Sequence, residues 1–421
     1  MKIVFLSPSG ELGGAEISLL DILASLRRAE PAWSLHLIAA SDGPLVRRAI
    51  AMGVRATVLA FPRPLARLGD AGIAAGNRDR LGLPDMIYKL LAASPSVVGY
   101  RARLGRSLKE LAPDIVHTNG FKMHILGVWA SPPGVPVIWH IHDYVGARAV
   151  ASRLLRRQAG SCFAAITNSK SVAEDLRMTL GAGLKIHTVY NAVDLDSFSP
   201  AGPRLDLDRL AGLARSEDET IRVGLVATFG RWKGHTVFLK ALSLLPASLN
   251  VRGYVIGGPL YQTDNSQCSL EELRGVARDL GLSDRVGFTG YVEETSSAVR
   301  ALDIVAHAST EPEPFGMVIA EAMACGRAVI ISEAGGASEL IERGVNALGH
   351  RPGDAPGLAA CIKQLALDPD LCARVGRAGR RTAERRFDRA RLADELIPIY
   401  NRAAQSVVGQ RLLQPDAALT R

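Results

Sequence analysis

Short apolar runs of strand length recur along the chain and alternate with longer segments of helical periodicity. The first run is Ile3–Leu6, which is followed by a glycine-rich loop at Pro8–Gly14 and by a segment, Ala15–Arg28, whose apolar residues recur at helical spacing. This alternation predicts parallel sheets with helices on both faces. Ligands of such sheets bind at the carboxyl ends of the strands, so residues at those ends are the first candidates for chemistry.

The alternation falls into two series. At 421 residues the chain is too long for one ordinary hydrophobic core. Between the series, Tyr190–Pro200 loses its periodicity and is rich in turn formers. We therefore predict a first domain over residues 1–193, a second over 194–385, and a C-terminal helix with its tail over 386–421. Two domains of this kind are expected to enclose a ligand cleft. The predicted strands are Ile3–Leu6, Leu35–Ala39, Ala56–Ala60, Ile115–His117, Val135–Ile141 and Phe163–Thr167 in the first series, and Val223–Ala227, Tyr254–Ile256, Val286–Phe288, Ile304–Ala306 and Ala328–Ile331 in the second.

Composition narrows the classes of partner. The 50 basic and 42 acidic residues give a net charge of +8, which suits nucleic acid, an anionic membrane or phosphorylated substrates. Aromatic residues make up only 5%, and no nucleic-acid-binding module is recognisable, so we expect no nucleic acid. The five cysteines have no C-x-x-C spacing, which fits a reducing cytosol. No run approaches the roughly 18 apolar residues that span a bilayer, so membrane contact is expected to be peripheral.

The most specific pattern lies between Ser309 and Glu339. Pro314 pushes Glu313 away from the α region and places it in a loop just before a helix. The first turn of that helix, predicted over Phe315–Val318, has unpaired N–H groups and a dipole that favour an anion. Glu321 lies farther along the same helix. The sequence thus predicts a phosphate-binding helix terminus with a carboxylate on either side.

Two cations follow the first strand of the second series. Arg231 and Lys233 are flanked by Gly230 and Gly234. An arginine supplies a planar fork and a lysine a point charge, a combination that suits a diphosphate. The alternative is a polar loop that only ends the strand.

The first series has two candidate features of its own. Gly13 and Gly14 lie between a strand and a helix, where a glycine pair forms a tight turn or approaches a ligand closely. His140 and His142 point to the same face at the end of a strand, but Asp143 falls on the other face and no third metal ligand is evident. We expect His142 to be a hydrogen-bonding group in the cleft, with simple packing as the alternative.

Two D-x-D patterns have the spacing of a divalent-metal site. They are Asp194–Asp196 and Asp206–Asp208, both in the region between the domains. Neither lies near the predicted phosphate site. We interpret both as solvated turns, because polar turn formers usually have no further role.

Taken together, these residues resemble those of glycosyltransferase family 4, which comprises retaining enzymes of the two-domain GT-B fold. The resemblance rests on GGAE at 13–16, NAVD at 191–194 with Phe198, the cation pair at 231 and 233, and EPFGMVIAEAMACGRAVI at 313–330. One departure is that many members have a longer insertion between the arginine and the lysine. The fold implied is two Rossmann-like doubly wound domains that face a central cleft.

The resemblance also implies roles for the candidate residues. The donor would be a nucleoside-diphosphate sugar, and no metal or other cofactor is expected. Amides near Phe315 and Met317 would assist the cations at the diphosphate, Glu321 would bind the ribose, Glu313 the transferred sugar, and Tyr291 and Val292 the base. The expected catalytic residues are His142, Glu313, Lys233 and Arg231, and the expected substrate-binding residues are Gly13, Gly14, Tyr291, Val292, Phe315, Gly316, Met317 and Glu321.

Because the leaving group is a diphosphate, stabilisation of its charge by cations and amides is expected to be the largest catalytic contribution. The family mechanism is front-face substitution, in which a donor phosphate oxygen accepts the proton of the acceptor. We predict a retaining, metal-independent, hexosyltransferase-type enzyme of cell-surface polysaccharide synthesis, located in the cytoplasm and acting on a glycan or lipid-linked acceptor. The alternative is a nucleotide-sugar-binding module without catalysis.

Basic and apolar residues are interleaved over Pro62–Leu111. Such a segment can rest on anionic lipid, which would bring the protein to the inner face of the membrane and to a lipid-linked acceptor. The alternative is an ordinary solvated insertion in the first domain.

Overall fold

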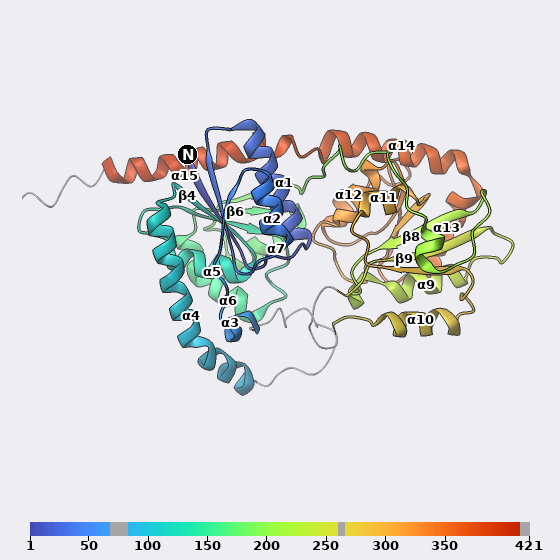
Figure 1. Cartoon of the computed structure of the whole chain (residues 1–421), viewed down its shortest axis with the longest axis horizontal. Coiled ribbons are helices and arrows are strands. Elements are labelled where there is room, and N and C mark those ends of the chain that lie inside the picture. The colour runs from blue at the N-terminus through green and yellow to red at the C-terminus, as the bar shows by residue number, and fades with distance from the viewer. Residues whose placement is uncertain (68–82, 260–265, 413–421) are drawn as a thin grey trace, which may run out of the picture. The chain divides into compact units, whose positions relative to one another are not determined.

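The computed structural model describes residues 1–67, 83–259 and 266–412, and these form two compact units (Figure 1). The first unit comprises Met1–Tyr190 together with Arg389–Arg421, and the second comprises Asn191–Asp388. The chain therefore passes from one unit to the other twice. The boundaries predicted at 193/194 and 385/386 lie within a few residues of these two passages.

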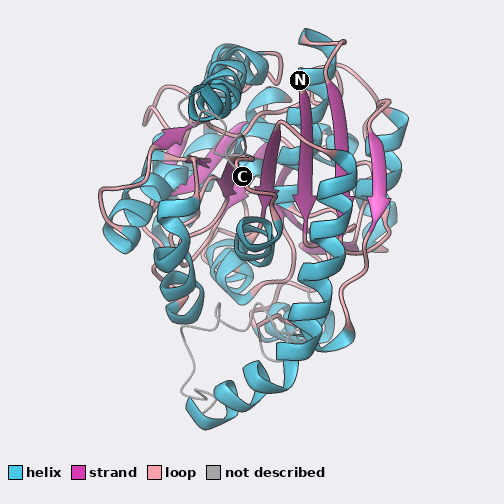
Figure 2. Cartoon of the chain, turned by 90° about the vertical axis from the view of Figure 1, so that its left-hand side faces the viewer, coloured by secondary structure: helices cyan, strands magenta, loops and turns pink. Residues whose placement is uncertain are grey.

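The first unit is built on a seven-stranded parallel sheet with the order β3-β2-β1-β4-β5-β6-β7. Figure 2 shows these strands with helices packed around the sheet. The strand order reverses between β1 and β4, which pair directly with each other. The strands are β1 (Lys2–Ser7), β2 (Ser34–Ala39), β3 (Arg55–Val58), β4 (Ile115–Asn119), β5 (Val137–Ile141), β6 (Ala164–Thr167) and β7 (Ile186–Thr188). The helices are α1 (Gly14–Ala29), α2 (Pro44–Ala51), α3 (Arg63–Arg67), α4 (Leu83–Leu111), α5 (Phe121–Ala130), α6 (Ala149–Gln158), η1 (Ala159–Ser161), α7 (Lys170–Leu180) and α15 (Arg391–Leu412).

The second unit repeats this architecture with six parallel strands in the order β10-β9-β8-β11-β12-β13. Here the order reverses between β8 and β11. The strands are β8 (Ile221–Val226), β9 (Val251–Ile256), β10 (Val286–Gly290), β11 (Ile304–His307), β12 (Ala328–Ser332) and β13 (Leu348–His350). The helical segments are α8 (Leu207–Ala211), η2 (Arg231–Lys233), α9 (His235–Ser243), α10 (Leu270–Asp279), α11 (Thr295–Arg300), α12 (Met317–Ala324), η3 (Gly336–Glu339), α13 (Ala355–Leu367) and α14 (Pro369–Arg386).

In both parallel sheets the connecting helices cover the two faces, so the central strands are largely buried. Strands β4, β5, β11 and β12 are buried along their whole length, and each of them begins with an apolar run. Where a helix crosses very close to a strand, a glycine makes room. A Cβ atom at Gly253 in β9 would lie 2.3 Å from Cδ1 of Leu242 on α9. The predicted α/β class with two doubly wound, Rossmann-like domains is confirmed.

Helix α15 follows the second unit in sequence but belongs to the first. It packs against α1 and β4. Tyr400 on α15 is fully buried, and its hydroxyl lies 3.0 Å from Nδ1 of His117 on β4. Nearer the start of α15, the backbone N–H of Ala393 donates to the hydroxyl of Ser25 on α1 at 3.0 Å. The core of the first unit is thus completed by residues from the far end of the chain.

Candidate functional site

In the second unit, the cation pair and the Glu313 loop meet where the strand order reverses. The turn η2 follows β8, the loop of Glu313 follows β11, and these two strands are neighbours. The backbone N–H of Thr310 donates to the carbonyl of Trp232 at 2.8 Å and joins the two segments. Gly234 makes this approach possible, because its φ is +74° and a Cβ there would lie 1.8 Å from the carbonyl oxygen of Ala308. Such reversal points are where doubly wound sheets bind ligands.

Lys233 and Glu313 form an ion pair at this junction. The Lys233 ammonium lies 2.9 Å from both carboxylate oxygens of Glu313, and the two side chains are 23% and 12% exposed. The Ser309 hydroxyl donates to Oε2 of Glu313 at 2.8 Å. Burial alone would raise the pKa of Glu313, but the charge of Lys233 and a hydrogen bond from His307 outweigh burial and hold the pKa well below its usual value. Glu313 is therefore ionised and tightly held.

Ser309 and His307 support this carboxylate, and sequence reasoning assigned neither of them a role. Nε2 of His307 lies 3.1 Å from the Ser309 hydroxyl and 3.5 Å from Oε2 of Glu313. The Ser309 carbonyl in turn accepts from the hydroxyl of Ser332 on β12 at 2.6 Å. The only sequence signal for these residues is their position at the carboxyl end of a buried strand.

Helix α12 begins just after Glu313, but later than predicted. Its N-cap is Gly316, with φ of +87°, so the helix starts at Met317. Phe315 lies outside the helix, and its side chain is buried against the ring of Phe387 with a centroid distance of 5.8 Å. The prediction that the first turn covers Phe315–Val318 is therefore wrong at its first residues. The left-handed glycine is the physical reason, because it sets the helix start and turns Phe315 into the core.

Glu321 is buried within α12, 8% exposed. Among the residues that the structure describes, none donates a hydrogen bond to its carboxylate. Burial raises the pKa of Glu321 to about 7, so at neutral pH the group is balanced between its two forms. A buried carboxylate without a partner is costly unless a ligand satisfies it, which makes Glu321 a candidate binding group.

The second predicted cation pairs with a different carboxylate. Both terminal nitrogens of Arg231 donate to Glu272 on α10, at 2.7 and 3.1 Å, and the two side chains are 49% and 42% exposed. Glu272 also belongs to the capping box of α10, together with Ser269. The planar fork of Arg231 is thus engaged with α10, whereas Lys233 is engaged with Glu313.

The residues predicted to contact a base follow β10. Tyr291 is 75% exposed and Val292 is half-buried. A Cβ atom at Gly258, just past β9, would lie 3.6 Å from Cβ of Tyr291, so the ends of these two strands are adjacent. Tyr291 therefore presents an exposed ring at the same edge of the sheet that carries Lys233 and Glu313.

In the first unit, Gly13 is the N-cap of α1, which begins at Gly14. The backbone N–H of Gly13 donates to the carboxylate of Glu16 at 3.1 Å. His142 follows β5, and its Nε2 lies 2.5 Å from Oδ1 of Asn119, the last residue of β4. Burial lowers the pKa of His142 to about 3, so the ring is neutral. Sequence reasoning missed Asn119, although it ends a strand at the reversal of the strand order.

The predicted shared face of His140 and His142 is confirmed, since their ring centroids are 4.0 Å apart. Asp143 instead pairs with Arg148 at 2.5 Å. Over residues 1–67, 83–259 and 266–412, no group of three or more histidine, cysteine, aspartate and glutamate side chains is arranged to hold a metal ion.

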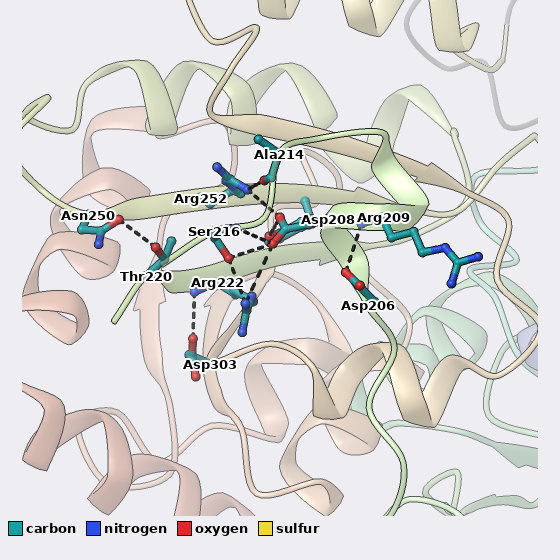
Figure 3. A network of polar contacts seen from close by, with 11 residues as sticks. Asp206, Asp208, Arg209, Ala214, Ser216, Thr220, Arg222, Asn250, Arg252 and Asp303 are labelled. Carbon is teal, nitrogen blue, oxygen red and sulfur yellow. Dashed lines mark hydrogen bonds and ion pairs between the residues drawn. The ribbon is translucent and has the colours of Figure 1, made fainter. Parts of the chain in front are cut away.

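One of the D-x-D patterns is not a solvated turn (Figure 3). Asp208 is 4% exposed and accepts hydrogen bonds from Arg252 at 2.7 Å, from the hydroxyl of Tyr254 at 2.6 Å and from the backbone and side chain of Ser216. Asp206 caps α8 by accepting from the backbone N–H of Arg209. The interpretation as a turn fails for Asp208 because Arg252 and Tyr254 on β9, together with Ser216, give its buried carboxylate hydrogen-bond partners. Asp206 and Asp208 therefore stabilise the fold of the second unit.

The basic segment Pro62–Leu111 is described only in part. Over its second half, α4 turns Tyr100, Leu104 and Leu108 into the core, and these side chains are fully buried. The exposed side of this part carries basic residues, among them Arg106 and Lys109. Residues 68–82 and the side chains of 83–94, with most of the predicted apolar positions, lie outside the described part. Within it, no helix combines the length and the apolar character that crossing a bilayer requires.

Two family models match the chain. One, described as Glycosyltransferase Family 4, covers residues 12–197, and the other, Glycosyl transferases group 1, covers residues 214–382. A D-inositol 3-phosphate glycosyltransferase of Xylanimonas cellulosilytica is 29% identical over 94% of this chain and 93% of its own. An alpha-maltose-1-phosphate synthase of Mycobacterium tuberculosis is 26% identical over 96% of this chain and 99% of its own.

A solved structure extends these matches to the fold. Anabaena HepE, crystallised with UDP and glucose, is 26% identical, has a TM-score of 0.76, and is matched over 95% of this chain and 99% of its own. The two family models together take in both units, and the strand order of each sheet is that of a doubly wound domain. The chain accordingly belongs to glycosyltransferase family 4 and has the two Rossmann-like domains of the GT-B fold.

Proposed function

We propose that the protein is a retaining, metal-independent glycosyltransferase that moves a hexose or similar sugar from a nucleoside-diphosphate sugar to a glycan or lipid-linked acceptor of cell-surface polysaccharide synthesis. The observation that carries this proposal is the junction of Lys233, Glu313 and the N-terminus of α12, with the unpartnered carboxylate of Glu321 in the same helix. A cation and a helix terminus suit a diphosphate, and two carboxylates suit the hydroxyls of its sugars.

Each group has a role that its chemistry supports. The Lys233 ammonium and the first N–H groups of α12 stabilise the negative charge that develops on the departing diphosphate. Glu321 accepts hydrogen bonds from the ribose hydroxyls, which supplies the partner that its buried carboxylate lacks. Glu313, oriented by Ser309 and His307, accepts from hydroxyls of the transferred sugar. Tyr291 and Val292 lie against the base, and Gly13, Gly14 and His142 serve the sugar and the acceptor from the first unit.

The reaction breaks the bond between the anomeric carbon and the diphosphate oxygen, and the acceptor oxygen forms a new bond to that carbon on the same face. The acceptor hydroxyl gives its proton to an oxygen of the departing phosphate, so charge and atoms balance. No carboxylic acid is required, since the diphosphate is already a good leaving group. Because HepE was crystallised with UDP and with UDP-glucose, UDP-glucose is the first donor to test.

The test is transfer from labelled UDP-glucose and related donors to a panel of glycan and lipid-linked acceptors, with and without EDTA. We expect an α-linked product from an α-linked donor, and activity that survives EDTA. Lys233→Ala and Glu313→Ala should abolish transfer, whereas Lys240→Ala, on the exposed face of α9, serves as a matched control. Full transfer by both site variants would refute the proposal. Binding of the donor without transfer or hydrolysis would favour a non-catalytic nucleotide-sugar-binding module.

We also propose that the protein works in the cytoplasm and contacts the anionic inner face of the membrane through the basic side of α4. Support comes from the exposed Arg106 and Lys109, which lie opposite the buried apolar face of that helix. Flotation with vesicles of neutral lipid, and of neutral lipid plus phosphatidylglycerol, tests this contact. Binding should require the anionic lipid and weaken as salt is raised. Equal flotation with both vesicles, or with neither, would overturn it.

A further inference from the structure

Asn119 occupies the point where the strand order of the first sheet reverses, and it is completely buried. Its side chain joins two features that were predicted separately. The amide nitrogen Nδ2 donates to the carbonyl of Ala15, in the first turn of α1, at 3.3 Å. The amide oxygen Oδ1 lies 2.5 Å from Nε2 of His142. One side chain thus holds both the helix start after Gly13–Gly14 and the ring of His142.

These two contacts determine the hydrogen positions. A carbonyl can only accept, so the group that faces Ala15 must be the NH₂ of the amide and the group that faces His142 must be its oxygen. An amide oxygen can also only accept, so Nε2 of His142 carries the proton. In the neutral ring the remaining nitrogen, Nδ1, then has a lone pair and is an acceptor. Nδ1 has no hydrogen-bond partner among the described residues.

The neighbouring groups keep the ring in place and neutral. The side-chain amide of Asn168 donates to the backbone carbonyl of His142 at 3.1 Å, and the tilted ring of His140 lies 4.0 Å from the His142 ring, centroid to centroid. The titratable side chains around it are His117, His124 and His140, and burial lowers the pKa of each. Asp143 is engaged with Arg148. No neighbouring carboxylate therefore competes with Asn119 for Nε2 of His142 within the described part of the chain.

We infer that Asn119 is a positioning residue, which fixes His142 in the tautomer with its proton on Nε2 so that Nδ1 accepts a hydrogen bond from a hydroxyl of the sugar or acceptor. Because Asn119 is also hydrogen-bonded to Ala15, it fixes the position of the His142 Nδ1 atom relative to the N-terminus of α1. The inference rests on the proposed function in one respect, namely that the ligand of this unit carries hydroxyl groups.

The experiment reads the tautomer directly, by ¹⁵N NMR of the full chain labelled at histidine, with the His142 signal assigned by its loss in His142→Gln. In the wild-type protein we expect a single His142 tautomer with Nδ1 unprotonated. In Asn119→Ala we expect a mixture of both tautomers. Thermal unfolding of each variant, with the exposed Asn250→Ala as the matched control, verifies that the fold is intact.

Kinetics supply the second readout. Asn119→Ala should lower kcat/KM about tenfold, the usual effect of one hydrogen bond. Asn119→Asp places a carboxylate against Nε2, which favours the imidazolium and converts Nδ1 from acceptor to donor. The acid limb of its pH profile should therefore move up by about 1–3 pH units.

A role in packing alone would lower the unfolding temperature of the variants and leave both the tautomer and the pH profile unchanged, which would overturn the inference. The NMR measurement needs no substrate, so it decides the positioning of His142 even if the protein transfers no sugar. Transfer by the wild-type protein, combined with an unchanged tautomer in Asn119→Ala, would refute the inference and leave the proposed function standing.

Discussion

Replacing Lys233 with methionine tests the central ion pair, because methionine keeps the apolar stem and removes the charge. Glu313 would remain buried and would keep its contacts with Ser309 and His307. Removing one partner of a fully buried pair costs about 3–5 kcal/mol. The Lys233 side chain is 23% exposed, so water screens part of the attraction, and Ser309 still donates to the carboxylate. We therefore expect a loss of about 1–3 kcal/mol in the free energy of unfolding at pH 8.

The sign of the pH dependence sharpens this prediction. In the wild-type protein the pKa of Glu313 is depressed, so its stabilising contribution is present above the usual carboxyl pKa and is lost only as the pH falls through the lower folded value. Without Lys233, burial dominates and raises the pKa of Glu313. The variant then regains stability as the pH falls and Glu313 takes up a proton. Its deficit should be largest at pH 8 and smallest near pH 4.5.

The assay is urea unfolding at pH 8, 6 and 4.5 of the wild type, Lys233→Met, Glu313→Gln and the double variant. Lys240→Met is the control for the loss of an exposed lysine. The double-mutant cycle should give a coupling energy of at least about 1 kcal/mol at pH 8. The reasoning is refuted if the two substitutions are additive, or if the Lys233→Met deficit is the same at all three pH values.

Three further changes have defined outcomes. Gly234→Ala should destabilise the second unit by about 1–3 kcal/mol in urea unfolding and weaken donor binding, because the added Cβ would clash with the Ala308 carbonyl. An unchanged unfolding midpoint would contradict this. Glu321→Gln should raise the melting temperature at pH 8, because a carboxyl whose pKa rises to about 7 on folding disfavours the folded state once it is ionised. The same variant should weaken nucleotide binding in calorimetry. A lower melting temperature would contradict this reasoning. Acidification from pH 7 to pH 5 should lower the free energy of unfolding by about 2 kcal/mol for each buried histidine that stays neutral in the folded state, such as His117 and His140. The first unit should therefore lose hydrogen-exchange protection before the second. Equal loss in both units would contradict this.

The parts of the fold that could be read from the sequence are those whose strands are buried on both faces. Such strands contain apolar runs, as β5, β11 and β12 do, and these were predicted within a few residues of their ends. The strands β7 and β13 were missed because each has only three residues at the edge of its sheet, and their sequences, IHT and LGH, have no apolar run. The start of β9 was hidden by Arg252 and Gly253, which serve the Asp208 network and the close approach of α9.

The candidate site was predictable where chemistry follows from position along the chain, as for Glu313 and Lys233. It was not predictable where residues distant in sequence are brought together by the sheet. Nothing local in the sequence indicates that Arg231 reaches Glu272, or that Asn119 reaches both Ala15 and His142. The same holds for Asp208, because its hydrogen-bond partners come from strand β9 and from Ser216, which precedes β8. Pairing across strands is a property of the topology, and periodicity along one segment carries no record of it.

The burial of Tyr400 and Leu396 in the first unit has a consequence for synthesis on the ribosome. Translation normally lets the N-terminal domain fold first. Here the first unit lacks part of its core until residues 391–403 have left the exit tunnel, whereas all of the second unit has by then emerged in one uninterrupted stretch. We expect the nascent second unit to gain protease resistance before the first, so that the order of maturation is the reverse of the order of translation.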